Sequence, residues 1–129
     1  MADPDAAHPA YVRHFIFEVD NTEVARLGKE AWEHGDAPRY LLVKAGTDHI
    51  FVEGKVVAVV KEPFIPALEP IGGTGDTITG IVSALIHSGL EPSDACTKAA
   101  KVNRTMGQLA NPTPATRIAQ LIPFISEAV

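Results

Sequence analysis

The chain has 129 residues and a formal net charge of −5; 46% of its residues are hydrophobic and 21% are charged. This length and composition suit one globular domain with a hydrophobic core, and the acidic balance argues against binding nucleic acid, whose phosphates need a basic surface. The single cysteine, Cys96, excludes a disulfide within the chain, and its alanine-rich surroundings predict a buried thiol. No apolar run approaches the roughly 18 residues of a membrane span, and the N-terminus lacks a signal pattern, so we expect a soluble cytoplasmic protein.

The N-terminal part predicts a strand followed by a helix. Residues 1–10 are polar and contain proline, so we expect a flexible N-terminus, with one domain over residues 11–129. Phe15–Val19 is rich in β formers and predicts a strand. A helix should follow from about residue 22 to residue 34, because an Asn-Thr pair can cap its start and a glycine can end it.

Three further strands are predicted in the middle of the chain. Tyr40–Val43 is continuously apolar, which is typical of a strand covered on both faces near the centre of a parallel sheet. The β formers at 49–53 and 56–60 lie on either side of Gly54 and Lys55. A glycine at the first position of a two-residue loop predicts a hairpin with a type II′ turn.

A glycine loop that runs directly into an amphipathic helix is the most informative stretch. Gly72, Gly73 and Gly75 precede apolar residues at helical spacing, so the helix should begin close to Asp76. Its first backbone N–H groups have no acceptor within the helix and lie at the positive end of the dipole, which suits a phosphate. The same residues also suit a tight turn with Asp76 as the helix cap. The P-loop and dinucleotide patterns are absent, since no lysine follows the glycines and Ile78 stands where a glycine is needed.

Two more helices are predicted towards the C-terminus. Pro92 fits the first turn of a helix that runs to about Ala110. The side chains expected to point inward are Ala95, Cys96, Ala99, Val102, Met106 and Leu109. The last helix should start at Thr113 and Pro114, with Pro123 as a kink or break.

The glycine loop resembles the Gly-Thr-Gly-Asp signature of the ribokinase-like superfamily, and most closely the carbohydrate-kinase-like domain of the NAD(P)H-hydrate dehydratases. Upstream, Leu41–Ile50 looks like that family's strand followed by Lys-Gly-x-x-Asp-x-Ile. Downstream, Ala99–Ala110 resembles its Ala-Ala-x-x-Asn-x-x-x-Gly-x-Leu-Ala helix, and Thr113–Pro123 resembles its closing Thr-Ala to Ile-Pro segment. These matches span most of the chain and correspond to the C-terminal half of a domain that is roughly twice this long.

The resemblance implies an α/β fold of the three-layer ribokinase-like kind: a half-domain with a parallel sheet, a β-hairpin and three C-terminal helices. It implies an adenine nucleotide, ATP or ADP, with its phosphates on the glycine loop, and Mg²⁺ is compatible with the carboxylates. In the superfamily the aspartate that matches Asp76 removes a proton from the acceptor hydroxyl, and in the hydrate dehydratases phosphoryl transfer drives elimination of water. Asn103 matches the family's helix asparagine on the base or ribose side of the nucleotide. Lys44 ends a strand where ligands collect in α/β folds, but one such lysine is also typical of a solvated rim charge. The implied binding residues are Gly72, Gly73, Thr74, Gly75, Lys44 and Asn103, with Asp76 as the catalytic residue.

Two other functions remain open on the sequence. One is a non-enzymatic module that keeps the nucleotide loop for ligand binding or assembly, and the other is an α/β scaffold whose glycines only make a turn. The five histidines form no ligand-spaced pair, so a structural zinc site is not expected and no metal ligand is assigned. The expected ligand is a small nucleotide, with no nucleic-acid or membrane partner. Because the family's N-terminal half has no counterpart here, we expect a homodimer in which each copy covers the other's open sheet edge.

Overall fold

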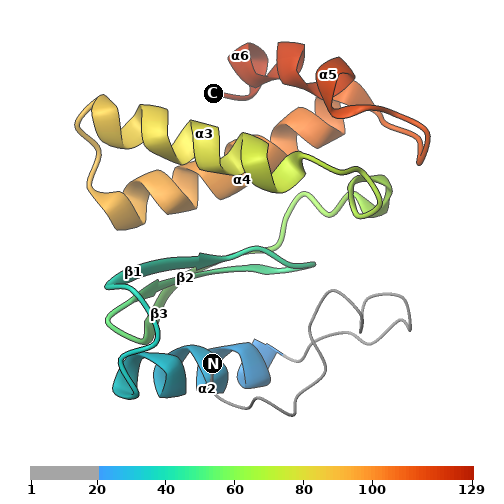
Figure 1. Cartoon of the computed structure of the whole chain (residues 1–129). Coiled ribbons are helices and arrows are strands. Elements are labelled where there is room, and N and C mark those ends of the chain that lie inside the picture. Colours follow the sequence, from blue (N-terminus) through green and yellow to red (C-terminus); the bar gives the residue numbers. More distant parts are fainter. Residues whose placement is uncertain (1–20) are drawn as a thin grey trace.

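The computed structural model describes residues 21–129, so the predicted strand Phe15–Val19 and the flexible segment before it lie outside the described residues. A three-stranded sheet lies at the middle of this range, with helices on both of its faces (Figure 1). The helix α2 (Asn21–Glu33) covers one face, and the long pair α3 (Thr74–His87) and α4 (Pro92–Ala110) covers the other. The mixed α/β class predicted from the sequence is therefore confirmed.

The sheet is antiparallel, with β2 (Asp48–Val52) between β1 (Tyr40–Val43) and β3 (Lys55–Val60). Leu41 lies opposite Phe51 in the first pair of strands, and the second pair is also antiparallel. The parallel sheet is thus not found among the described strands, because the loop from β1 to β2 is far too short for the crossover that parallel strands need. β1, expected at the centre, is an edge of this sheet and is only half-buried, whereas β2 is the buried strand. The ribokinase-like layering stays a prediction.

The hairpin between β2 and β3 forms as predicted, but its loop is shifted by one residue. Val52 pairs with Lys55, which leaves Glu53 and Gly54 in the loop. Their φ angles of +50° and +75° are those of a type I′ turn rather than the expected type II′. Gly54 lies against α2, since a Cβ built there would be 2.6 Å from Cβ of Trp32. A glycine at this position therefore lets the helix pack directly on the turn.

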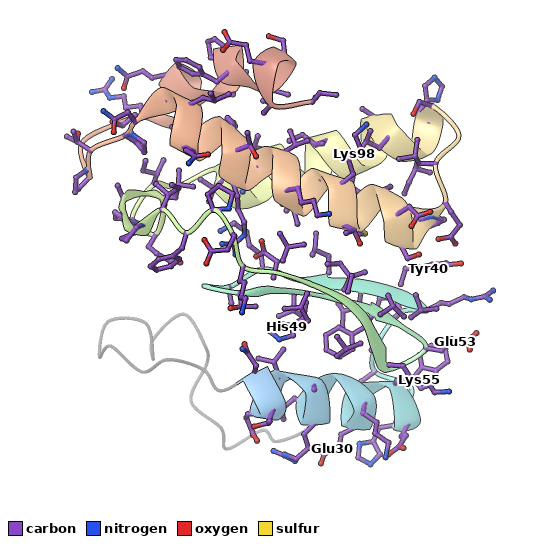
Figure 2. All side chains as sticks on the ribbon, turned by 180° about the vertical axis from the view of Figure 1, so that it is seen from behind. Glu30, Tyr40, His49, Glu53, Lys55 and Lys98 are labelled. Atoms are coloured by element: carbon purple, nitrogen blue, oxygen red, sulfur yellow. The ribbon has the colours of Figure 1, made fainter. Side chains whose placement is uncertain are left out.

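α2 approaches the sheet closely at Gly28. A Cβ built at Gly28 would lie 2.3 Å from Cε1 of Phe51, a ring that is only 1% exposed. His49 is also buried, and Figure 2 shows it on the α2 side of the sheet. These side chains therefore belong to the face that α3 and α4 do not cover.

The main core forms where α3 and α4 cover the other face of the sheet. Its buried members are Ile50, Val60, Ile78, Ile81, Cys96, Ala99, Ala100 and Val102. α4 has the predicted bounds, and its fully buried Ala99 and Ala100 let it lie close to its neighbours. Leu109 is the exception to the predicted inward set: it is exposed, because Met106 and Ala110 occupy the covered side of that turn.

The C-terminal segment begins its helix later than predicted. α5 (Ile118–Leu121), a 3-10 turn (Ile122–Phe124) and α6 (Ile125–Ala128) follow one another, and Pro123 lies at the break, as predicted. Thr113 opens a turn instead of a helix, and its N–H donates to a threonine hydroxyl within that turn. A second core cluster joins this segment to α4 and to the linker that contains the short helix η2 (Pro66–Leu68): Leu68, Ile71, Met106 and Leu121.

Candidate functional site

The N-terminus of α3 lies at the end of the glycine loop. Its first flanking residue, Gly73, has φ +94°, a left-handed conformation that favours glycine, and a Cβ there would lie 3.2 Å from Ile118. Among the described residues, no side chain caps this end of the helix. Because the first N–H groups of a helix have no acceptor inside it, Thr74, Gly75 and Asp76 present donors at the positive end of the dipole. This end of α3 is therefore suited to an anion.

The threonines of the first turn direct their hydroxyls to the backbone. Thr74 Oγ1 donates to the carbonyl oxygen of Ile71 at 3.4 Å, and Thr77 Oγ1 donates to that of Gly73 at 2.9 Å. Thr74, predicted to bind a ligand, therefore offers its backbone N–H and not its buried hydroxyl. Gly72 and Gly75 are open, since a Cβ built on either would have no described protein atom within 4 Å.

Lys44 at the end of β1 lies beside the start of α3. The two elements border a cavity of about 280 Å³ whose lining is Leu42, Lys44, Gly75, Ile78, Thr79, Val82, Ser83 and Cys96. Most of this lining is apolar or neutral, so the Lys44 ammonium is its one formal positive charge. The structure thus brings together two predicted binding residues, Lys44 and Gly75.

A second, smaller cavity connects Lys44 with Asn103. It has a volume of about 20 Å³, room for about one water molecule. Asn103 is 2% exposed, and among the described residues its Oδ1 has no hydrogen-bond partner. A buried amide oxygen without a partner is uncommon in native proteins and suggests a donor that the chain itself does not supply. Lys44 therefore lines both cavities, one together with Gly75 and the other together with Asn103.

Asp76, the predicted base, lies in the first turn of α3 with an exposed side chain. Its negative charge complements the helix dipole there. Asp76 lines neither of the two cavities, and the same is true of Gly72 and Gly73. The predicted site is thus divided: Lys44, Gly75 and Asn103 border the cavities, and the other residues lie along the loop and first turn.

A buried ion pair beside the smaller cavity is the part of this region that sequence reasoning does not find. Nε of Arg104 donates to Oδ2 of Asp48 at 2.8 Å, and the two side chains are 8% and 2% exposed. Oδ1 of the same carboxylate accepts the N–H of Ala45 at 3.2 Å. Both charged residues line the cavity that contains Asn103. The sequence gives one signal for this ion pair. Asp48 lies in Leu41–Ile50 and Arg104 lies in Ala99–Ala110, the segments on either side of the glycine loop that resemble the family.

The start of α4 contrasts with that of α3. Glu91 Oε2 accepts the N–H of Ser93 at 2.9 Å and its hydroxyl at 2.6 Å, and the hydroxyl of Tyr40 donates to Oε1 at 2.8 Å. These bonds, led by the one from the Ser93 hydroxyl, hold the pKa of Glu91 below its usual range. Cys96 is buried, as predicted, and burial raises the pKa of its thiol, which therefore stays protonated near neutral pH.

Residues 21–129 contain no cluster of three or more His, Cys, Asp or Glu side chains that could hold a metal ion. No helix in the described range is both long and apolar enough to cross a membrane. The candidate site is built from backbone N–H groups, one ammonium group and one carboxamide.

The chain is similar along its whole length to one protein and over part of its length to another. It is 43% identical over all 129 residues to an uncharacterized protein of Methanocaldococcus jannaschii, of which it covers 55%. It is 36% identical over 85 residues, 66% of the chain, to the bifunctional NAD(P)H-hydrate repair enzyme of Hyperthermus butylicus, of which it covers 15%. The chain thus spans about half the length of the first relative and a small part of the second. No family model and no solved structure matches the chain. The resemblance to the NAD(P)H-hydrate dehydratases is therefore supported in part, by a partial match to one repair enzyme.

Proposed function

We propose that the chain binds the phosphates of an adenine nucleotide, ATP or ADP, at the N-terminus of α3, in a role related to that of the NAD(P)H-hydrate dehydratases. The observation that carries this proposal is the start of α3, which has no side-chain cap among the described residues and whose second residue, Gly75, borders a cavity together with Lys44. The N–H donors, the helix dipole and the ammonium group all favour an anion, and the open glycines let phosphate oxygens approach the backbone. The partial similarity to the repair enzyme of Hyperthermus butylicus favours this class of nucleotide chemistry.

Asn103 extends the proposed site into the smaller cavity. Because that cavity has room for about one water molecule, Oδ1 of Asn103 can accept a hydrogen bond from a water that in turn contacts the base or ribose of the nucleotide. A buried acceptor left without a partner costs about 1–3 kcal/mol, so a ligand that holds such a water in place gains from satisfying this acceptor. Lys44, which lines both cavities, would lie between the phosphates and this water.

In the enzymatic form of this function, Asp76 is the general base. Its exposed carboxylate follows Gly75 directly, so it can take a proton from an acceptor hydroxyl while the helix start stabilises the charge on the transferred phosphoryl group. Mg²⁺ would arrive on the nucleotide phosphates, and an exposed carboxylate is a ligand that this ion accepts.

A non-catalytic nucleotide-binding or assembly module is the second candidate. The position of Asp76 outside both cavities favours it, because a general base needs a pocket that holds the acceptor within hydrogen-bond reach. For assembly, the exposed Val57 and Val59 of the edge strand β3 offer a surface on which a second copy could pair. Such a module would bind the nucleotide without catalysing a reaction.

Binding is tested by thermal unfolding and calorimetric titration with Mg²⁺ present. ATP or ADP at a hundredfold excess over Kd should stabilise the fold by about 2.7 kcal/mol, whereas adenosine, which has no phosphates, should have little effect. Lys44→Ala should weaken ATP binding about tenfold or more. The matched control is Lys55→Ala, since Lys55 is exposed at the opposite end of the sheet (Figure 2). A wild-type protein that responds to adenosine as strongly as to ATP, or to neither, would refute the phosphate site.

Turnover is tested with hydrated NADH or NADPH and ATP or ADP, by following the return of reduced-nicotinamide absorbance. Asp76→Asn keeps an oxygen that suits the first turn of α3 but cannot take a proton, so it should bind nucleotide as wild type does and lose turnover. Wild-type turnover that persists in Asp76→Asn would remove Asp76 from the mechanism. Binding without wild-type turnover would favour the module.

A further inference from the structure

Arg104 of α4 uses all five of its guanidinium N–H donors inside the protein. One carboxylate and four backbone carbonyls accept them: Asp48 Oδ2 at 2.8 Å, Gly46 O at 2.9 Å, Lys61 O at 3.0 Å, Ala45 O at 3.3 Å and Pro63 O at 3.5 Å. An arginine side chain has five such donors in a fixed planar fork. The side chain is therefore fully satisfied at a position where it is only 8% exposed.

The acceptors lie in two segments that lead to the candidate site. Residues 45–48, called the 45–48 turn below, follow Lys44 directly and comprise the last three residues between β1 and β2 together with the first residue of β2. Residues 61–63 begin the linker that carries the chain from β3 to the glycine loop. Arg104 also follows Asn103, which lines the same small cavity and whose buried Oδ1 has no partner among the described residues. One side chain thus ties α4 to both of the segments that bring residues to this cavity.

Stability alone is a weak reason for this arrangement. Well-packed apolar residues are often as stabilising as a buried ion pair, since burying two charges costs much of what their attraction gains. Apolar side chains donate no hydrogen bonds, however, so they cannot fix the directions of the four carbonyl groups. A lysine could neutralise Asp48, but its single ammonium nitrogen cannot reproduce the planar fork. The contacts of Arg104 therefore specify the conformation of the 45–48 turn.

We propose that Arg104 is a positioning residue of the nucleotide site. It holds the 45–48 turn, and so places the preceding Lys44 where it borders both Gly75 and Asn103. Without the hydrogen bonds of the Arg104 guanidinium the 45–48 turn is less ordered. The Lys44 ammonium group then contacts the phosphates for a smaller fraction of the time. The ligand part of this inference rests on the proposed function, whereas the ordering of the turn does not.

The first experiment needs no ligand. Hydrogen exchange of the backbone amides at 44–48 should be about tenfold faster or more in Arg104→Lys than in wild type, while exchange in α3 is little changed. The control is Arg26→Lys, because Arg26 pairs with Glu23 and Glu30 on the exposed surface of α2. Unchanged exchange at 44–48 in a folded Arg104→Lys protein would overturn the inference.

The second experiment is a double-mutant cycle on ATP binding. Arg104→Lys alone should weaken binding about tenfold, and in a Lys44→Ala background the same change should cost less than about twofold, since Arg104 acts through Lys44. A merely structural role predicts the same loss in both backgrounds, and that result would overturn the proposal.

The role of Arg104 can still be tested if Arg104→Lys does not fold or if wild type binds no nucleotide. If Arg104→Lys does not fold, Asp48→Asn takes its place, since it keeps an oxygen for Nε while removing the charge; exchange at 44–48 should again be faster, and unchanged exchange would overturn the inference. If wild type binds no phosphorylated nucleotide, the proposed function fails, and the exchange experiment alone then decides the role of Arg104.

Discussion

Replacing Gly75 by alanine separates the stability of α3 from its proposed use. Gly75 is the second residue of the helix, its φ is not left-handed, and a Cβ there would meet no described atom within 4 Å. Alanine should therefore stabilise the protein by about 0.4–1 kcal/mol, because it restricts the unfolded chain and suits a helix. For a domain of this length, the melting temperature should rise by about 2–4 °C.

The added methyl group would project into the space beside Lys44 that the phosphates are proposed to occupy. We expect ATP affinity measured by calorimetry to fall about tenfold or more while the protein becomes more stable. Gly80→Ala is the matched control, since Gly80 lies in the same helix, is equally open and borders neither cavity. It should give a similar stabilisation and leave binding unchanged. Equal ATP affinity in the Gly75→Ala and Gly80→Ala proteins would refute the placement of the phosphates at this helix start.

Three further predictions concern the fold and assembly. Gly28→Ala should lower the free energy of unfolding by about 1–3 kcal/mol in urea titration, because the new Cβ would lie 2.3 Å from the buried ring of Phe51; a more stable variant would contradict this packing. The pKa of Glu91 is depressed in the folded state, so its stabilising contribution is present above its ordinary pKa of about 4.3 and is lost as pH falls below that value. Glu91→Gln should flatten this acid limb of the stability curve, and an unchanged slope would count against the cap. Light scattering should give a dimer mass that Val57→Lys on the exposed edge of β3 reduces to that of the monomer, and a monomeric wild type would exclude the dimer.

Elements whose ends carry strong local signals could be predicted from the sequence. α4 has the predicted bounds because Pro92 suits the first helical turn and Asn111 ends the helix in a left-handed conformation. The break at Pro123 has the same local origin. By contrast, the last helix starts later than the sequence predicts, because Thr113 and Pro114 suit a turn as well as a helix start.

The order of strands and the turn type depend on contacts that the sequence does not display. An apolar run such as Tyr40–Val43 reports that a strand is covered, and not which strands are its neighbours. The position of the hairpin loop depends on the packing of Gly54 against Trp32, which comes from a separate element. Both corrections thus concern tertiary neighbours and not local propensity.

The candidate site also has features that could be predicted from local sequence and features that depend on tertiary contacts. The open glycines and a helix that starts near them follow from local sequence, whereas the absence of a side-chain cap at Gly73, among residues 21–129, is seen only in the structure. That Lys44 lines cavities with both Gly75 and Asn103 depends on how α3 and α4 cross the end of β1. The partner of Asp48 could not be predicted either, since Arg104 is on another element and only tertiary packing brings the two together.

The two helices of the α3–α4 hairpin begin in opposite ways, and the difference bears on function. α4 starts at a proline with Glu91 capping it, so its positive end is satisfied within the protein. α3 starts at a left-handed glycine with no side-chain cap among the described residues; Asp76 lies in its first turn, and Lys44 borders a cavity together with Gly75. Positions at which a chain departs from such local rules are expected to be functional or strained sites. The buried oxygen of Asn103, which has no partner among the described residues, is a second departure beside the same lysine, and a phosphorylated ligand together with one water molecule in the smaller cavity would satisfy both.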